Sequence, residues 1–206
     1  MKYKTEQERF WAGEFGASYL ERNNSDSQLA CNLSFFSKAL MRTRNIKTVI
    51  EFGANIGMNL KALKHLLPGI EISAIEINPQ ATKALKKVIP KEQIFEGSIF
   101  DYGAKKQFDL VLIKGVLIHV NPEYLKAAYQ KLIDATRRYL LVAEYYNPTP
   151  LTVSYRGHGD RLFKRDFAAE ILDTCKELSL LDYGFVYHKD PVFPQDDITW
   201  FLLEKI

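Results

Sequence analysis

A glycine-containing turn between two acidic residues is the stretch of this chain whose residue types and spacing can do chemistry. Residues 48–57 read TVIEFGANIG, an apolar run that is broken by Gly53, Asn55 and Gly57. Glycines at such positions let the backbone turn tightly and approach a ligand. Glu76 ends the next apolar run, where a carboxylate can accept hydrogen bonds from the two hydroxyls of a ribose. The stretch therefore indicates a nucleoside-binding turn.

The spacing within the turn indicates which nucleoside is expected. A dinucleotide fingerprint is G-x-G-x-x-G, but counting from Gly53 places Asn55 at the second glycine position and Met58 at the third. The pattern E-x-G-x-N-x-G, from Glu51 to Gly57, instead resembles the first motif of class I S-adenosylmethionine-dependent methyltransferases, commonly E/D-x-G-x-G-x-G. Asn55 departs from the usual glycine, so we expect it to contact the ligand through its amide or to cap the next helix. The alternative is that both glycines are only turn residues.

The strands that must position this turn are indicated by apolar runs. They are expected at residues 49–52, 72–76, 93–97, 108–113, 139–144, 180–188 and 197–205. Because these runs alternate with helical patterns, we expect an α/β fold of the Rossmann-like class I methyltransferase type. Its sheet would be seven-stranded and mostly parallel, with helices on both faces and an antiparallel final strand. One domain is expected over residues 1–206, with an N-terminal helical lid or cover at 1–45 and a catalytic core at 46–206 that includes a substrate loop at 145–165.

The helices are indicated by caps and by apolar periodicity. Thr5 and Glu8 form a capping box, so a short aromatic-rich helix is expected to begin there. Further helices are expected at residues 29–44, 58–67, 79–88, 121–132 and 166–178. Trp11, Tyr19 and Arg22 suit a lid or a cofactor clamp over the open edge of the sheet. The alternative is that the first aromatic residues only close the edge of the core.

The remaining cofactor contacts are expected at the carboxyl ends of neighbouring strands. Ser98 and Ile99 stand where this enzyme class commonly places an acid and an apolar residue around adenine. Because serine replaces the acid, its hydroxyl, a backbone amide or Asp101 would have to recognise the edge of the base. The full set of expected cofactor-binding residues is Trp11, Tyr19, Arg22, Gly53, Ala54, Asn55, Gly57, Glu76, Ile77, Ser98, Ile99 and Lys114.

Cationic residues are most concentrated in the segment 155–165. Arginine side chains bind carboxylate or phosphate through two parallel hydrogen bonds, so this segment predicts a small anionic acceptor. The expected substrate-binding residues are Tyr146, Tyr155, Arg156, Arg161 and Arg165. The alternative is an ordinary solvated loop. A sequence of the N-P-P-Y or D-P-P-Y type, common in nucleobase-methylating enzymes, is absent after the strand at 108–113, which argues against a nucleobase acceptor.

Methyl transfer depends mainly on alignment, because the methyl donor is already activated. An amine or hydroxyl acceptor would still benefit from a base. The candidates are His119, Glu144, Tyr145 and His158, without a ranking among them. Most histidines in this kind of position are packing or hydrogen-bonding residues, which is the alternative for His119. No histidine and cysteine spacing indicates a metal, so none is expected.

The chain as a whole resembles the methyltransferases associated with pseudaminic acid biosynthesis. The resemblance rests on the segments FWAGEFGASYLERN, VIEFGANIGMNL, FDLVLIKGVLIHVNP, YLLVAEYYNPTP, SYRGHGDRLFKRDFA and DPVFPQDDITWFLLEK. It implies a class I fold with S-adenosylmethionine as cofactor. It also implies an acceptor linked to nonulosonic acid biosynthesis, such as an acidic sugar or a sugar nucleotide. The alternatives are methylation of a protein or peptide and a non-catalytic, cofactor-binding regulatory protein.

Composition limits the other possibilities. With 28 basic and 25 acidic residues among 206, the net charge of +3 argues against nucleic-acid binding through bulk electrostatics. The N-terminus is polar and no apolar run approaches the length of a membrane span, so we expect no membrane association and a cytoplasmic protein. Cys31 and Cys175 are expected as reduced thiols within helices. The expected assembly is a monomer or a homodimer.

Overall fold

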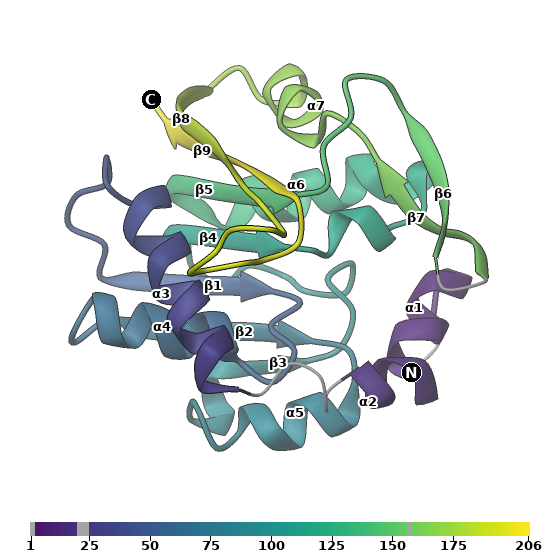
Figure 1. Ribbon diagram of the computed structural model, residues 1–206, viewed down its shortest axis with the longest axis horizontal. Coiled ribbons are helices and arrows are strands. Elements are labelled where there is room, and N and C mark those ends of the chain that lie inside the picture. Colours follow the sequence, from purple (N-terminus) through teal and green to yellow (C-terminus); the bar gives the residue numbers. More distant parts are fainter. Residues whose placement is uncertain (1–2, 20–24, 156–157) are drawn as a thin grey trace.

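The computed structural model describes residues 3–19, 25–155 and 158–206, without the side chains of residues 17–19, 155 and 158–160. Seven strands form one sheet in the order β3-β2-β1-β4-β5-β9-β8 (Figure 1). They are β1 (Thr48–Phe52), β2 (Glu71–Glu76), β3 (Ile94–Glu96), β4 (Phe108–Lys114), β5 (Thr136–Glu144), β8 (Leu178–Val186) and β9 (Ile198–Lys205). Strands β1 to β5 pair in parallel, and β9 runs antiparallel to both β5 and β8. The predicted fold class is confirmed.

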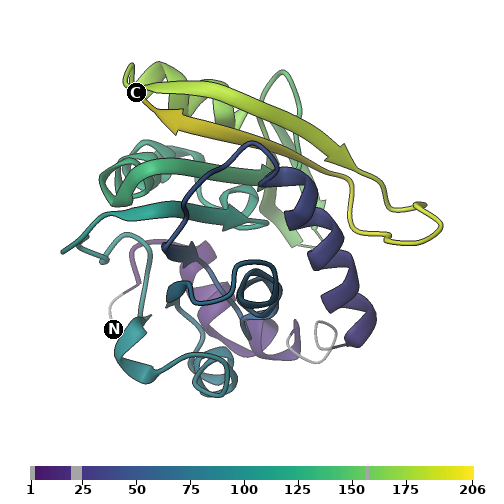
Figure 2. The same ribbon diagram turned by 90° about the vertical axis from the view of Figure 1, so that its left-hand side faces the viewer.

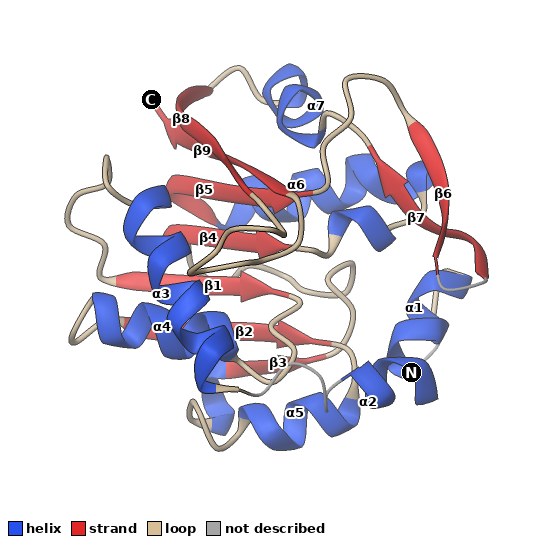
Figure 3. Ribbon diagram, viewed as in Figure 1, coloured by secondary structure: helices blue, strands red, loops and turns tan. Residues whose placement is uncertain are grey.

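Helices cover both faces of this sheet (Figure 3). They are α1 (Glu6–Ala12), α2 (Glu14–Tyr19), α3 (Asp26–Ala39), α4 (Met58–Leu66), α5 (Pro79–Leu85), α6 (Leu125–Ala135) and α7 (Phe167–Thr174). Successive strand residues point to opposite faces. Val49 therefore packs in the core under α3 and α4, while Ile50 packs in the core under α6 and α7. Strands covered on both faces are mostly apolar, and the central strands β1, β4 and β5 follow this pattern apart from a few polar residues such as Glu51.

Helix α3 runs beside β8 and β9, against the same face of the sheet as α4 (Figure 2). Its inward side carries Phe35, Phe36 and Ala39, which are almost completely buried. The helix ends at Ala39, although the apolar periodicity predicted an end near Arg44, because Leu40 leaves the helical conformation and Thr43 bonds back to its carbonyl. The polar N-terminal half of α3 is left to face the carboxyl edge of the sheet.

A second, two-stranded sheet replaces most of the loop that was expected at 145–165. Strands β6 (Leu151–Tyr155) and β7 (His158–Lys164) pair antiparallel, and the hairpin stands next to α1 (Figures 1 and 3). Strands were not predicted here because glycine and charged residues interrupt the alternation of apolar and polar residues. The consequence is that the cationic residues belong to a hairpin with fixed neighbours.

Other boundaries also differ from the predictions. The N-terminal helix is interrupted at Gly13, which has an extended backbone, and so forms α1 and α2. Pro122 begins a 3-10 turn, η4 (Pro122–Tyr124), ahead of α6, and α7 ends at Thr174 because Leu178 already belongs to β8. Within the ranges described above, no helix is both long enough and apolar enough to cross a bilayer.

Candidate functional site

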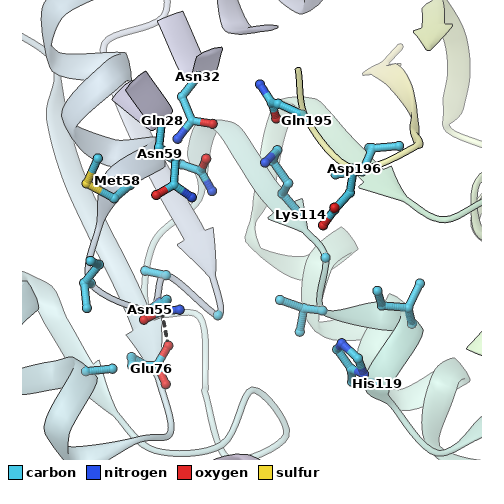
Figure 4. Close-up of a pocket in the computed structure, with 18 of the residues that line it drawn as sticks. Gln28, Asn32, Asn55, Met58, Asn59, Glu76, Lys114, His119, Gln195 and Asp196 are labelled. Atoms are coloured by element: carbon cyan, nitrogen blue, oxygen red, sulfur yellow. Dashed lines mark hydrogen bonds between the residues drawn. The ribbon is translucent and has the colours of Figure 1, made fainter. Parts of the chain in front are cut away.

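A cavity of about 560 Å³ lies at the carboxyl ends of β1, β2 and β4 (Figure 4). Its floor is the turn at 53–56 with the strand ends at 76–78 and 114–116, and its sides are α3 and the segment 194–196 that precedes β9. The carboxyl edge of the strands is where ligands bind in open α/β folds, because the βα loops and helix N-termini meet there. The cavity is therefore the candidate active site.

The turn after β1 adopts the conformation that its glycines predicted. Gly53, Asn55 and Gly57 have positive φ angles of 77°, 50° and 84°. A side chain at Gly53 would place its Cβ 2.5 Å from a methyl group of Val116, so only glycine lets β1 and the β4 loop approach this closely. Gly57 does not line the cavity; its missing side chain makes room for Leu85. Gly57 therefore shapes the turn from behind, while Gly53 and Ala54 lie at the cavity.

The buried carboxylate of Glu76 is held by two backbone amides. Its Oε2 accepts a hydrogen bond of 2.7 Å from Asn55 N, and its Oε1 accepts one of 2.7 Å from Asn78 N (Figure 4). Burial raises the pKa of Glu76, and the amides of Asn78, Asn55 and Ile77 oppose that shift. The carboxylate is thus oriented at the cavity wall, and each oxygen retains a lone pair that can accept a hydroxyl donor.

Asn55 reaches the site through its backbone rather than through its side-chain amide. The backbone N–H binds Glu76, while the side-chain Oδ1 is buried and has no hydrogen-bond partner in the part of the chain that the structure describes. The predicted helix cap by Asn55 is wrong, because α4 begins after Gly57 without a side-chain cap.

Asn78 joins the N-terminal helices to the edge of the sheet. Its Oδ1 accepts hydrogen bonds from the backbone amides of Gln80 and Ala81, so Asn78 is the N-cap of α5. Its Nδ2 donates to the carbonyl oxygens of Trp11 and Gly13, at 2.9 and 3.3 Å. This contact brings Trp11 to the cavity, where the sequence placed it.

One end of the cavity combines acidic and basic groups. Glu51 is 1% exposed; its Oε1 accepts from Asn59 Nδ2 at 2.6 Å, and its Oε2 has no hydrogen-bond partner among the described residues. Burial raises the pKa of Glu51 to about 8, against the opposing effects of Asn59 and the Lys114 charge. Burial lowers the pKa of Lys114, and the charges of Glu51 and Asp196 oppose that shift. Of the charged groups here, Lys114 and Asp196 line the cavity, and an α-amino acid group, with one charge of each sign, matches them.

A smaller pocket of about 90 Å³ adjoins the cavity. The two share Trp11, Gly53, Ile77, Val116 and His119. The small pocket is mainly aliphatic, and its other lining residues are Thr5, Gln7, Glu8, Ile75, Gly97, Ser98, Ile99, Phe100 and Val120. A flat, largely apolar ring suits such a slot, so Ser98 and Ile99 lie where the sequence expected the base.

The side chains of Ser98 and Asp101, after β3, already have partners in the protein. Ser98 is buried and its Oγ already accepts a hydrogen bond from Phe100 N. The Asp101 side chain is 47% exposed and forms a 2.8 Å ion pair with Lys4. The suggestion that Asp101 substitutes for the missing acid is therefore not favoured by its position.

His119 lines both compartments. It lies in a 3-10 turn, η3 (Leu117–His119), after β4, and its ring centroid is 4.5 Å from that of Trp11. Its Nδ1 is 2.7 Å from the carbonyl oxygen of Arg161. Because a carbonyl can only accept, Nδ1 carries the hydrogen and Nε2 carries the lone pair in the neutral ring. Burial lowers the pKa of His119 to about 4, so the ring is neutral near pH 7.

Glu144 supports the η3 turn. Its Oε1 accepts from the amides of Val116 and Leu117 at 3.0 and 2.9 Å, and its Oε2 is 3.4 Å from Ile118 N. Burial raises its pKa to about 7. The carboxylate is directed at the backbone and does not line the cavity, so the geometry gives Glu144 a positioning role in place of the expected catalytic one.

Tyr145, the residue that follows β5, lines the cavity. Its ring lies 5.4 Å from the ammonium group of Lys164 on the hairpin. The exposed neighbour Tyr146 packs against Phe201 of β9 and does not line the cavity.

The described arginines of the hairpin have acidic partners. Arg161 Nη2 lies 3.2 Å from Glu6 on α1, and its guanidinium lies over the ring of Phe10. Arg165 Nε lies 2.7 Å from Glu170 on α7. These contacts fasten the hairpin to α1 and α7. Arg22 and Arg156 lie outside the described residues, as do the side chains of Tyr19, Tyr155 and His158.

Several cavity residues were not predicted from the sequence. Gln28 and Asn32 lie four residues apart on α3, on the same side of the cavity as Asn59 (Figure 4). Their polar character within an otherwise apolar helix face was the available signal. Gln195 and Asp196 also line the cavity, and Gln195 Nε2 donates to the carbonyl oxygen of Cys31 at 2.8 Å.

One family model matches part of the chain. Residues 50–139 match the family described as a methyltransferase domain. The match agrees with the enzyme class that the sequence predicted, a methyltransferase. The comparison with curated proteins gave no significant match.

Solved structures show the same fold at low sequence identity. The Burkholderia thailandensis 1,6-didemethyltoxoflavin-N1-methyltransferase, with S-adenosylhomocysteine bound, has a TM-score of 0.75 at 13% identity, over 100% of this chain and 91% of that one. The magnesium protoporphyrin IX methyltransferase from Synechocystis PCC 6803, with S-adenosylmethionine bound, has a TM-score of 0.68 at 13% identity over 100% of both chains. A methyltransferase from Archaeoglobus fulgidus has a TM-score of 0.65 at 12% identity, over 93% of this chain and 100% of that one.

We expect Glu76→Ala to weaken the binding of S-adenosylmethionine and S-adenosylhomocysteine at least about tenfold, because each charge-assisted hydrogen bond to a ribose hydroxyl contributes roughly 1.5–3 kcal/mol. Titration calorimetry measures the effect. Glu96→Ala is the matched control, since Glu96 is the register partner of Glu76 on β3 but is exposed and paired with Lys86. Equal losses in the two variants would contradict a specific grip by Glu76.

Glu51→Gln should gain stability relative to the parent protein as the pH rises. The folded-state pKa of Glu51, about 8, lies above its ordinary value of 4.5, so between these values the folded state binds the proton more tightly than the unfolded state. The parent protein therefore loses stability as pH rises through this window, and the variant lacks that loss. Urea unfolding without ligand at about pH 5 and about pH 9 measures the free energy of unfolding of both proteins. If the variant is no more stable relative to the parent protein at pH 9 than at pH 5, the pKa of Glu51 is not raised.

Proposed function

We propose that this protein transfers a methyl group from S-adenosylmethionine to a small-molecule acceptor that enters between His119, Tyr145 and Asp196. The observation that carries the proposal is the Glu76 carboxylate, which the amides of Asn55 and Asn78 fix at the wall of the larger cavity, next to the small apolar pocket. One compartment is aliphatic and the other is charged. A ligand with a base, a ribose and an amino acid group in that order fits the small apolar pocket, Glu76 and the charged part of the cavity, respectively.

The residues divide into roles by their neighbours. Glu76 would hold the ribose, the small apolar pocket would hold the base, and Lys114 with Asp196 would face the amino acid group. When bound, the cofactor supplies an electrophilic methyl group on a cationic sulfur.

The acceptor side needs alignment and a place for a proton. His119 lines the cavity with a neutral ring and a lone pair on Nε2, so it can take a proton from an amine or hydroxyl acceptor. Glu144 holds the turn that carries His119, and Trp11 covers the ring and limits access of water. We therefore assign His119 as the base and Glu144 as its positioning residue.

For the acceptor we propose an acidic sugar or sugar nucleotide linked to nonulosonic acid biosynthesis. Two features support an anionic acceptor: the resemblance of the whole chain to the pseudaminic acid-associated methyltransferases, and the positive charges of Lys114 and Lys164 around Tyr145. The described arginines contribute less than the sequence suggested, because their partners are Glu6 and Glu170.

Turnover assays test this proposal directly. Purified protein with S-adenosylmethionine and a panel of nonulosonic acids, their biosynthetic intermediates and their nucleotide-activated forms should yield a product heavier by one methyl group, measured by mass spectrometry. Neutral sugars of the same size are the control for the anionic requirement. Methylation of peptides alone would favour a protein methyltransferase, and tight cofactor binding without turnover of any acceptor would favour a regulatory protein.

We expect His119→Gln to lower kcat at least about a hundredfold, which is the usual contribution of a general base, while the Kd for S-adenosylmethionine changes less than about threefold. His65→Gln, at an exposed position on α4, is the matched control. Steady-state kinetics and calorimetry separate the two quantities. A kcat close to that of the parent protein would remove His119 from the chemistry.

A further inference from the structure

We propose that Glu8 of α1 recognises the adenine edge of the cofactor by accepting a hydrogen bond from its exocyclic amine. This proposal rests on the proposed function, because it concerns the base of S-adenosylmethionine in the small aliphatic pocket. It places the reader of the base on the N-terminal helix, ahead of every strand of the sheet.

One oxygen of Glu8 is already used within the helix. Oε2 accepts from the backbone amides of Lys4 and Thr5, at 2.6 and 2.9 Å, and the Thr5 hydroxyl accepts from Glu8 N in return. This is the capping box that the sequence predicted. The carboxylate is therefore fixed in orientation, with Oε2 turned toward the start of the helix.

The other oxygen, Oε1, has no hydrogen-bond partner within the described parts of the chain. Glu8 is 8% exposed, lines the small pocket, and its Oε1 is buried without a hydrogen bond to any described residue. A buried carboxylate oxygen that lacks a donor costs free energy, and such atoms call for an explanation in a ligand or a function. A donor inside the pocket would satisfy it, and the amine of adenine is a donor.

The side chains of Ser98 and Asp101, after β3, are less suited to that amine than Glu8. The neutral hydroxyl of Ser98 already accepts from Phe100 N, and a charged carboxylate oxygen is the stronger acceptor. Asp101 is turned outward to Lys4. The neighbouring Gln7 offers both a donor and an acceptor, so its amide alone cannot tell an amine from a carbonyl.

Helix α1 is held over the pocket by contacts from three separate parts of the chain. Asn78 binds the carbonyl oxygens of Trp11 and Gly13, Arg161 pairs with Glu6, and Asp101 pairs with Lys4. The position of Glu8 is thus set by the ends of β2 and β3 and by the hairpin. A group that reads a base must be held in this way, because hydrogen-bond selectivity depends on fixed geometry.

The capping box makes Glu8→Gln an informative substitution. The two backbone amides at the helix start still need an acceptor, so the amide oxygen of the glutamine takes the place of Oε2 and its NH₂ group faces the pocket. The pocket then presents a donor where it had an acceptor. Adenine should be disfavoured, and hypoxanthine, which has a carbonyl oxygen in place of the amine, should be favoured.

Titration calorimetry with S-adenosylhomocysteine and S-inosylhomocysteine tests the proposal. The parent protein should prefer the adenine compound at least about tenfold. Glu8→Gln should lose or reverse that preference, mainly by weaker binding of the adenine compound. Glu14→Gln, an exposed glutamate on α2, is the matched control and should keep it. Circular dichroism and thermal unfolding verify that the variants are folded.

Three outcomes would overturn the proposal. A parent protein that binds both compounds equally does not recognise the amine. A folded Glu8→Gln protein that keeps the full preference recognises the amine through another group, and loss of the preference in Asp101→Asn would assign recognition to Asp101. Equal binding by the parent protein overturns the proposal even if Glu8→Gln does not fold. Failure of the parent protein to bind either compound would overturn the proposed function itself, which distinguishes the two failures.

Discussion

The buried carboxylate of Glu76 is the contact on which the site depends. A carboxylate taken out of water is costly unless several donors surround it, and here the donors are backbone amides of the β1 turn and of the start of α5. The same two hydrogen bonds hold the glycine turn against the end of β2. The group that would hold the ribose therefore also builds the floor of the cavity, so that binding and local structure share one set of bonds.

Three buried acids lie at the same edge of the sheet, and each is satisfied differently. Glu51 is bonded by the Asn59 side chain, whereas Glu76 and Glu144 are bonded by backbone amides. Burial raises the pKa of all three, and Lys114 moderates the negative charge of Glu51 and Glu144. Of the three, only Glu76 lines the cavity, so its carboxylate is the one that a bound ligand would meet.

The N-terminal helices complete the site from outside the sheet. Asn78 fastens them to the end of β2, and the hairpin fastens them through Arg161 and Glu6. Trp11 and Glu8 then face the two compartments from the same short helix. Arg161 and Arg165, which the sequence analysis expected to bind the acceptor, pair with Glu6 of α1 and Glu170 of α7.

Local features of the sequence were enough to predict the strands of the sheet, the glycine turn and the acid Glu76 at the end of a strand. Apolar periodicity, glycine spacing and an acid at the end of an apolar run can each be read from neighbouring residues. The sequence also determined the Glu8 capping box, which spans only three residues. Three contacts could be found only in the folded structure: Asn78 with the Trp11 carbonyl, Glu144 with the amides of η3, and Arg161 with Glu6. These contacts join residues far apart in the chain, and their partners are fixed only when the strands and helices pack.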